Sequence, residues 1–467
     1  MTCQTFTPPV RNGLLARIGD AMQRHQKAIR GIQWVVVLFY IVLVAVPAFL
    51  PLPDHSRHIL NNLTLFAQFL FWGIWWPFVL LSMVLVGRMW CGIFCPEGTL
   101  SEWASRHGRG GAIPRWMRWG GWPFIAFVLT TIYGQMVSVY QYPKATLLIL
   151  GGSTVAAILV GYLYGRNRRV WCRYLCPVNG VFGLLAKLAP LHYRTDEAIW
   201  VANRSQWRGV HTANCPTLLP LHALDNASPC HMCGRCSGYR DAIGLAARVP
   251  GAEVVTSDPQ HATLGEFLLI TFGLGGIAVG AFHWSASPWF VTLKQQLALW
   301  LIDHDGLWVL QQHAPWWLFT NYPQQNDVFN LLDGGLLLAY ITLTGLLLGV
   351  VQFLFLGMSA RLLGGPWRPR LFHLAYALIP LVGAGVFLGL SAVTVSMLRA
   401  ELLSITWASP LRALVLGGTT AWSLWLLWSI VHRHLSATAR ALAAFAVGCG
   451  AIAVVAWAWY LLFWGWS

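Results

Sequence analysis

Eight cysteines occupy short motifs between residues 91 and 236 of this 467-residue chain. Two motifs read R-x-W-C-x3-C-P, another reads C-x2-C-x2-C, and a single cysteine before a proline precedes the latter. The eight are Cys91, Cys95, Cys172, Cys176, Cys215, Cys230, Cys233 and Cys236. Cysteine runs that end in C-P bind iron–sulfur clusters in bacterial ferredoxins. Because two [4Fe–4S] clusters need about eight thiolates, we expect two such clusters.

The first two motifs form an internal repeat with an offset of 81 residues. One runs from Arg88 to Pro96 and the other from Arg169 to Pro177, and each directly follows an apolar stretch. Proline fixes φ and removes one N–H, so each C-P pair is expected to bend the chain around a cluster.

The third motif is an incomplete ferredoxin run, because Arg240-Asp241 stands where its fourth cysteine is expected. Cys215-Pro216, 15 residues before Cys230, supplies a displaced C-P pair. Two partitions of the ligands remain open. One cluster takes the four cysteines of the repeat and the other takes Cys215 with the third motif, or cysteines before proline exchange between clusters as in ferredoxins. Zinc is the alternative metal, disfavoured because C-x3-C-P is not a usual tetrahedral zinc spacing.

Composition places the rest of the chain in a membrane. It is 57% hydrophobic, only 10% charged and contains 27 tryptophans, a residue enriched at membrane interfaces. The net charge of +15 comes from basic residues that flank apolar runs, so it does not indicate nucleic acid. Residues 14–30 could form a basic amphipathic helix on the inner membrane surface or a solvated lead-in.

We predict an all-α polytopic membrane protein with about nine transmembrane helices of about 20 residues each. The expected spans are 32–52, 63–86, 119–140, 145–165, 264–284, 331–357, 373–396, 411–431 and 441–463. With the N-terminus in the cytoplasm, 26 of the 31 Lys and Arg residues fall in inner connections. The positive-inside rule therefore predicts cytoplasmic cysteine motifs and a periplasmic C-terminus in a bacterial inner membrane. Because the cytoplasm is reducing, metal binding is favoured over disulfides.

Four segments follow from these spans. They are a cytoplasmic N-terminal segment 1–31, a four-helix membrane part 32–176 with both repeat motifs, a small ferredoxin-like cytoplasmic segment 177–263, and a five-helix membrane part 264–467 with an outer loop 285–330. The ferredoxin-like segment has few aliphatic residues, so we expect it to need its metal ligands to fold.

Residues 60–245 resemble the membrane polyferredoxins typified by NapH, NosR and CcoG, which carry paired CxxxCP motifs and a ferredoxin segment. The long polytopic form is most similar to the FtrD-type subunit of bacterial iron-uptake systems. This resemblance implies two [4Fe–4S] clusters and a role in periplasmic iron or other metal uptake. The implied partners are a permease and a periplasmic metal-binding or cupredoxin-like protein.

The outer loop holds a second set of metal-ligand residue types, Asp303, His304, Asp305 and His313. These side chains could bind iron or copper, or the loop could be a solvated amphipathic segment. We find no Walker motif, dinucleotide fingerprint or catalytic triad in the sequence, so no organic substrate is indicated.

The function predicted from the sequence is electron transfer through two clusters, from a cytoplasmic donor or membrane quinol to a partner. The alternatives are a quinol-oxidising respiratory donor, a metal-reducing assembly factor and a redox-gated metal transporter. Electrons from inner clusters must still cross about 30 Å of hydrocarbon, and no redox centre is evident in the spans.

Overall fold

The computed structural model describes residues 13–54, 57–203, 214–311, 314–435 and 439–466. These residues form two compact units between which the chain passes repeatedly. Unit 1 comprises the described parts of 1–40, 79–119 and 153–253, and unit 2 those of 41–78, 120–152 and 254–467. All eight motif cysteines therefore belong to unit 1.

Unit 1 combines membrane helices with a small two-stranded sheet. Its elements are α1 (Leu14–Arg24), the first part of α2 (Gln26–Ala45), most of α4 (Trp76–Val86), α5 (Met89–Ile93), α6 (Pro96–Arg106), α9 (Gly152–Tyr164), α10 (Val170–Tyr174), α11 (Asn179–Ala186), β1 (Leu191–Thr195), α12 (Glu197–Ala202) and β2 (Ile243–Ala247). Strands β1 and β2 pair antiparallel, with Leu191 opposite Ala247 and Thr195 opposite Ile243.

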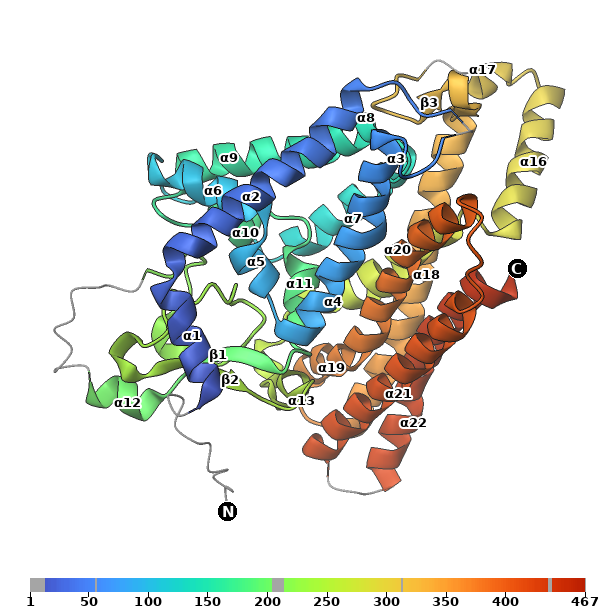
Figure 1. Cartoon of the computed structure of the whole chain (residues 1–467). Coiled ribbons are helices and arrows are strands. Elements are labelled where there is room, and N and C mark those ends of the chain that lie inside the picture. The colour runs from blue at the N-terminus through green and yellow to red at the C-terminus, as the bar shows by residue number, and fades with distance from the viewer. Residues whose placement is uncertain (1–12, 55–56, 204–213, 312–313, 436–438, 467) are drawn as a thin grey trace. The chain divides into compact units, whose positions relative to one another are not determined.

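Helix α1 packs against this sheet, as Figure 1 shows. A Cβ on Gly19 would lie 3.3 Å from Leu245 Cβ and 2.8 Å from Ser237 Oγ, so the helix backbone approaches β2 closely. The Ser237 hydroxyl also donates to Asp20 Oδ1 at 2.8 Å. Thus α1 covers the segment of the third cysteine motif, a role that neither sequence alternative for residues 14–30 included.

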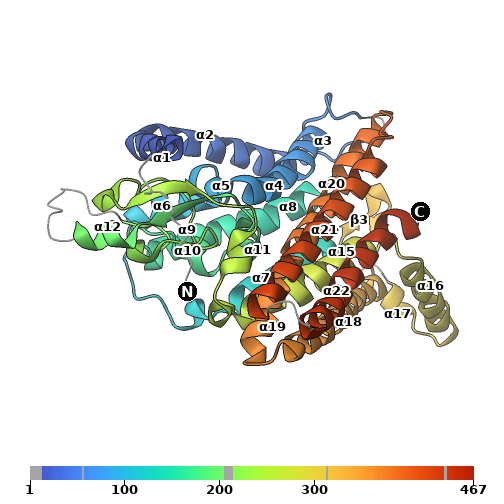
Figure 2. The same cartoon turned by 90° about the horizontal axis from the view of Figure 1, so that it is seen from below.

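Unit 2 is a bundle of long helices. Its elements are α3 (Leu63–Gln68), α7 (Trp122–Met136), α8 (Pro143–Thr146), α13 (Ala252–Thr256, which begins at the boundary), α14 (Leu264–Leu268), α15 (Ala278–His283), α16 (Pro288–Asp303), α17 (Leu307–Leu310), β3 (Asn321–Tyr322), β4 (Asp327–Val328), α18 (Leu331–Leu363), α19 (Trp367–Ala375), α20 (Ile379–Ala400), α21 (Ala408–His434) and α22 (Ala439–Tyr460). Helix α18 packs on α22 and α21 packs on α20 and α22, and Figures 1 and 2 show these helices side by side.

Eight helices in the described residues are long and apolar enough to cross a membrane. They are Gln26–Phe49, Leu63–Val86, Pro143–Tyr164, Leu264–His283, Leu331–Leu363, Trp367–Ala400, Ala408–His434 and Ala439–Gly465. Several are continuous only because π-helical stretches, such as Leu269–Ile277, join their α-helical parts. The expected class, an all-α polytopic membrane protein, is confirmed.

The predicted span 119–140 is the exception, because its helix α7 has only 15 residues. At 1.5 Å per residue such a helix is about 22 Å long, less than the roughly 30 Å of a hydrocarbon core. Nevertheless α7 runs beside the whole span Leu264–His283 in the same direction. A Cβ on Gly265 would lie 2.5 Å from Gly120 O at one end, and Trp284 Nε1 donates to Gln135 Oε1 at 3.0 Å at the other.

Candidate metal centre

The two repeat motifs fold alike. Cys91 lies in the short helix α5 and Cys172 in the matching helix α10. Cys95 is the N-cap of α6, with Pro96 at its first position, where the missing N–H of proline has no structural cost. The backbone N–H of Gly98 points at Cys95 Sγ, 3.4 Å away. Each motif therefore presents one thiol from a short helix and another from the turn that follows it.

The four thiols of the repeat share one buried environment. Burial raises the pKa of Cys95 well above its ordinary value, and the charges of Cys172 and Cys91 raise it further. Burial also raises the pKa of Cys176 well above its ordinary value, with Glu97, Cys172 and Cys95 adding to the shift. The structure thus brings Cys91, Cys95, Cys172 and Cys176 within electrostatic range of one another.

The other four cysteines line a single cavity. Its volume is about 370 Å³ when counted out to the open mouth, and its walls include Cys215, Cys230, Cys233 and Cys236. Burial raises the pKa of Cys236 well above its ordinary value, and the charges of Cys230, Cys233 and Cys215 add to this effect. Cys215, which the sequence placed only as a displaced C-P pair, therefore lies with the third motif.

Tyr193 of β1 reaches into the same cavity. Its side chain is only 1% exposed. Burial raises the pKa of its hydroxyl, and the charges of Cys236, Cys233 and Cys230 raise it further. Among the described residues its hydroxyl has one hydrogen-bond partner, the thioether of Met22 at 3.7 Å. Thioethers are weak acceptors, so this phenol O–H is poised beside the cysteines with little else to bind.

Two buried arginines lock the repeat motifs together in a reciprocal way. Arg88, from the first motif, donates to Asn179 Oδ1 after the second motif at 2.6 Å. Arg169, from the second motif, donates to the carbonyl oxygen of Cys91 in the first at 2.6 Å. The arginines of the repeated R-x-W-C pattern therefore bind each other's motif.

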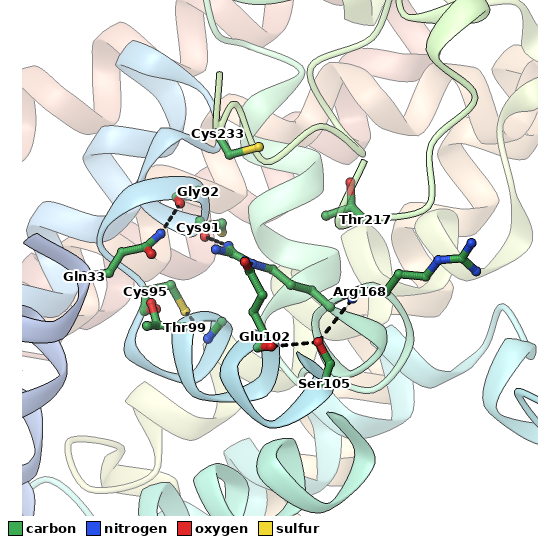
Figure 3. Close-up of polar contacts among 12 residues, drawn as sticks. Gln33, Cys91, Gly92, Cys95, Thr99, Glu102, Ser105, Arg168, Thr217 and Cys233 are labelled. Atoms are coloured by element: carbon green, nitrogen blue, oxygen red, sulfur yellow. Dashed lines mark hydrogen bonds and ion pairs between the residues drawn. The ribbon is translucent and has the colours of Figure 1, made fainter. Parts of the chain in front are cut away.

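Glu102 of α6 joins all three motifs. Its carboxylate accepts from Arg169 Nε at 2.9 Å and from Arg235 Nη2 at 2.6 Å, and Arg235 stands between Cys233 and Cys236. Burial alone would raise the pKa of Glu102, but Arg169 and Arg235 together lower it to about 2. Figure 3 shows Glu102 with Ser105 beside it, whose hydroxyl donates to the Glu102 carbonyl oxygen at 2.7 Å.

The first and third motifs touch at their backbones. A Cβ on Gly92 would lie 2.2 Å from His231 O and 3.0 Å from the Cys233 nitrogen, so only glycine fits here. Gln33 donates to Gly92 O and Gln26 to Cys233 O, each at 2.9 Å. Figure 3 shows Gly92 with Cys91 and Cys233 close by. The two thiol sets are thus adjacent parts of one centre.

This donor set fits iron–sulfur clusters. Burial raises the pKa of five of these thiols, namely Cys95, Cys172, Cys176, Cys230 and Cys236, and binding of metal is what makes such cysteines thiolates. Two buried guanidinium N–H groups, Arg88 Nε and Arg169 Nη2, find no acceptor among the described residues, as donors facing an anionic group would. No three His, Cys, Asp or Glu side chains within the described ranges converge on a single-ion position. Each cysteine of a four-iron cluster binds a different iron, so its ligands need no such convergence.

The outer residues predicted to bind metal are not drawn together. Asp303, His304 and Asp305 are exposed at the end of α16, and His304 Nδ1 lies 2.8 Å from the carbonyl oxygen of Trp300. His313 lies outside the described residues. A metal site here stays a prediction from the sequence.

Sequence reasoning missed the residues that hold the centre together, namely Gln26, Gln33, Glu102, Tyr193 and Arg235. The repeated arginines before W-C were visible as a pattern, and their recurrence was the one available signal. Glu102 had none, because its partners Arg169 and Arg235 lie 67 and 133 residues away in the chain.

The repeat of the CxxxCP motif also appears when the chain is compared with known protein families. A family model described as a 4Fe-4S binding domain matches residues 68–114 and again 147–195, so each match contains one CxxxCP motif. The chain is 26% identical over 172 residues to the "Putative electron transport protein YccM" of Escherichia coli (strain K12), which covers 32% of this chain. It spans 46% of that relative's length. No solved structure matches the chain.

The fold and the site together define the class of protein to which this chain belongs. The chain is a polytopic membrane protein with a duplicated iron–sulfur cluster-binding region. The cysteines of the third motif lie beyond both matched regions.

Proposed function

We propose that the chain is a membrane-bound electron-transfer protein that holds two [4Fe–4S] clusters side by side. The observation that carries this proposal is the backbone contact of Gly92 with His231 and Cys233, which sets two groups of four thiols against each other. The similarity to a relative described as an electron transport protein supports it.

When bound, the clusters supply one-electron acceptance and release. The chain's own residues provide the anchoring, burial and charge that this chemistry requires. Burial of Cys91, Cys172 and Cys230 limits the access of water to the centre, and the arginine–glutamate network ties the motifs to one another. Such a network would keep structural reorganisation small when an electron moves.

We assign Cys91, Cys95, Cys172 and Cys176 to one cluster and Cys215, Cys230, Cys233 and Cys236 to the other. Two observations favour this partition. The cysteines within each set influence one another's pKa, and the second set lines a single cavity. The alternative is that the cysteines before proline bind the other cluster, as in ferredoxins. Cys215→Ala is the sharpest test, because Cys215 is the one proposed ligand of its set that lies outside the C-x2-C-x2-C motif.

The iron content of Cys215→Ala should fall from about eight to about four per chain, with the spectrum of the other cluster retained. Cys449→Ala, a change of the same kind in α22 of unit 2, should keep both. Loss of the repeat cluster's spectrum in Cys215→Ala would contradict the partition.

The direction of electron flow follows from the proposed orientation in a bacterial inner membrane. Cytoplasmic clusters would receive electrons from a cytoplasmic donor or from membrane quinol. Because about 30 Å of hydrocarbon must then be crossed, a partner's cofactor or a quinone would carry the electrons onward.

The biological role proposed is periplasmic iron, or other metal, uptake, as in the FtrD-type polyferredoxins that the chain resembles. A permease and a periplasmic metal-binding or cupredoxin-like protein would be its partners. Cells that lack the chain should take up radiolabelled iron more slowly, and the Cys172→Ala protein should not restore uptake. If uptake is unchanged in those cells and the purified protein still contains clusters, the uptake role is wrong. A role in respiration or in assembly of another metalloenzyme would then be favoured.

A further inference from the structure

Arg169 lies where every cysteine motif meets. Its guanidinium binds the carbonyl of Cys91 and the carboxylate of Glu102. Its backbone N–H donates at 2.7 Å to the carbonyl oxygen of Pro216, the residue that follows Cys215. The side chain comes from the second motif, three residues before Cys172, and none of it is exposed.

One of its N–H groups remains unused. Arg169 Nη2 is buried and finds no acceptor among the described residues, although the other two guanidinium nitrogens are bonded at 2.9 and 2.6 Å. After Glu102, the charges that act most on this guanidinium are those of Cys172 and Cys233. These two cysteines belong to different thiol sets, so the guanidinium lies within electrostatic range of both sets.

A positive charge is needed at this position. A [4Fe–4S] cluster on four thiolates carries net negative charge, and two such groups buried side by side repel each other. That repulsion rises when either gains an electron. A buried guanidinium that donates to sulfur stabilises the reduced form, because hydrogen bonds and local charge set cluster potentials.

Given the two clusters of the proposed function, we propose that Arg169 is the positioning residue between them: its free Nη2–H donates a hydrogen bond to a cluster sulfur, and its charge raises the reduction potential. Arg169 also remains tied to Glu102, so it cannot turn away when the electron leaves.

The test compares three variants by EPR-monitored redox titration of the anaerobically purified protein, with iron and sulfide measured on the same samples. Arg169→Gln removes the charge yet leaves Glu102 paired with Arg235 and Arg106. Arg169→Lys keeps the charge but loses the planar fork. Arg168→Gln is the matched control, because this neighbouring side chain is exposed and points away from the cysteines (Figure 3).

Arg169→Gln is expected to lower at least one midpoint potential by about 59 mV or more, a tenfold change in the one-electron equilibrium. Arg169→Lys should fall between this variant and the wild type, and Arg168→Gln should match the wild type. Wild-type potentials in an Arg169→Gln protein with full iron content would overturn the inference.

A second measurement applies if Arg169→Gln fails to bind iron. In wild-type protein labelled with guanidinium ¹⁵N-arginine, pulsed EPR of the reduced clusters should show a weakly coupled nitrogen that is lost in Arg169→Lys. Absence of that coupling in the wild type contradicts the inference. Absence of iron from the wild type would instead defeat the proposed function.

Discussion

Tyr193 shows how a single buried side chain can tune the centre. Its phenol lines the cavity of the third motif, and in the part of the chain that the structure describes its one hydrogen-bond partner is a thioether. A bound cluster would give its O–H a sulfur acceptor, and such hydrogen bonds raise cluster potentials. Tyr193→Phe should therefore lower the potential of the cluster on Cys215, Cys230, Cys233 and Cys236, as measured by redox titration.

Tyr162→Phe is the matched control for this change. Tyr162 is 39% exposed in unit 1, and its ring keeps its contact with Arg109 when the hydroxyl is removed. Equal potentials in Tyr193→Phe and Tyr162→Phe would show that the Tyr193 hydroxyl does not reach a cluster.

Glu102 gives the centre a defined pH dependence. Its pKa is lowered to about 2, so its ion pairs contribute stability above the ordinary carboxyl pKa of about 4.3, and that contribution is lost as the pH falls towards 2. Glu102→Gln leaves the buried guanidinium of Arg169 and the half-buried one of Arg235 without a carboxylate, which should cost about 3 kcal/mol at pH 7. The gap in free energy of unfolding between wild type and variant should be constant from pH 8 to about 5. It should close between about pH 4 and 2.

Thermal unfolding of both proteins across that range measures the gap. A gap that already closes near pH 6 would mean that Glu102 is not held by Arg169 and Arg235 as described.

The cysteines that the structure brings together could be predicted from the sequence, whereas the residues that hold them in place could not. Cysteine spacing is local, since Cys91 and Cys95 are only four residues apart in the chain. Glu102 binds partners that only folding brings near, and Tyr193 enters the cavity because β1 pairs with β2, about 50 residues later in the chain. No local pattern marks such residues.

Among the elements, the contact between α5 and the third motif leaves no room for an added carbon at position 92. Ala at position 92 would place a Cβ 2.2 Å from the His231 carbonyl oxygen, and overpacking of this kind costs about 1–3 kcal/mol. Gly92→Ala should push the Cys230–Cys236 loop away and lower the iron content per chain. Gly31→Ala in α2 is the matched control, because its added Cβ meets nothing within 4 Å.

Iron analysis and thermal unfolding of the two glycine variants provide the readout. Full iron and wild-type stability in Gly92→Ala would show that the two motifs are not in contact.

The helices also show where the hydrophobic pattern of the sequence predicts membrane spans correctly. Eight predicted spans are long apolar helices, because about 20 apolar residues leave few alternatives. The ninth, α7, is short because the chain turns at Val137 and Ser138, and Ser138 adopts a left-handed φ of 50°. Hydropathy averages over such a turn, which is why the sequence suggested a longer helix.

At the scale of the whole molecule, the length of α7 decides the topology. Because α7 runs beside the entire span Leu264–His283, we expect it to cross the membrane with it. Nine crossings would put the two termini on opposite sides, and the orientation proposed from the basic residues would put the N-terminus in the cytoplasm and the C-terminus in the periplasm. A reporter that is active only in the periplasm should therefore work when fused after Ser467 and fail when fused before Met1. Activity of neither fusion, or of both, would indicate an even number of crossings.

The central claim is that the eight cysteines hold two [4Fe–4S] clusters in one centre. The most direct measurement is anaerobic purification of the full chain, with iron and sulfide analysis and EPR after dithionite reduction. About eight irons and eight sulfides per chain are predicted, together with a signal broadened by spin coupling between neighbouring reduced clusters. Zinc without iron, or about four irons with an uncoupled signal, would contradict the account.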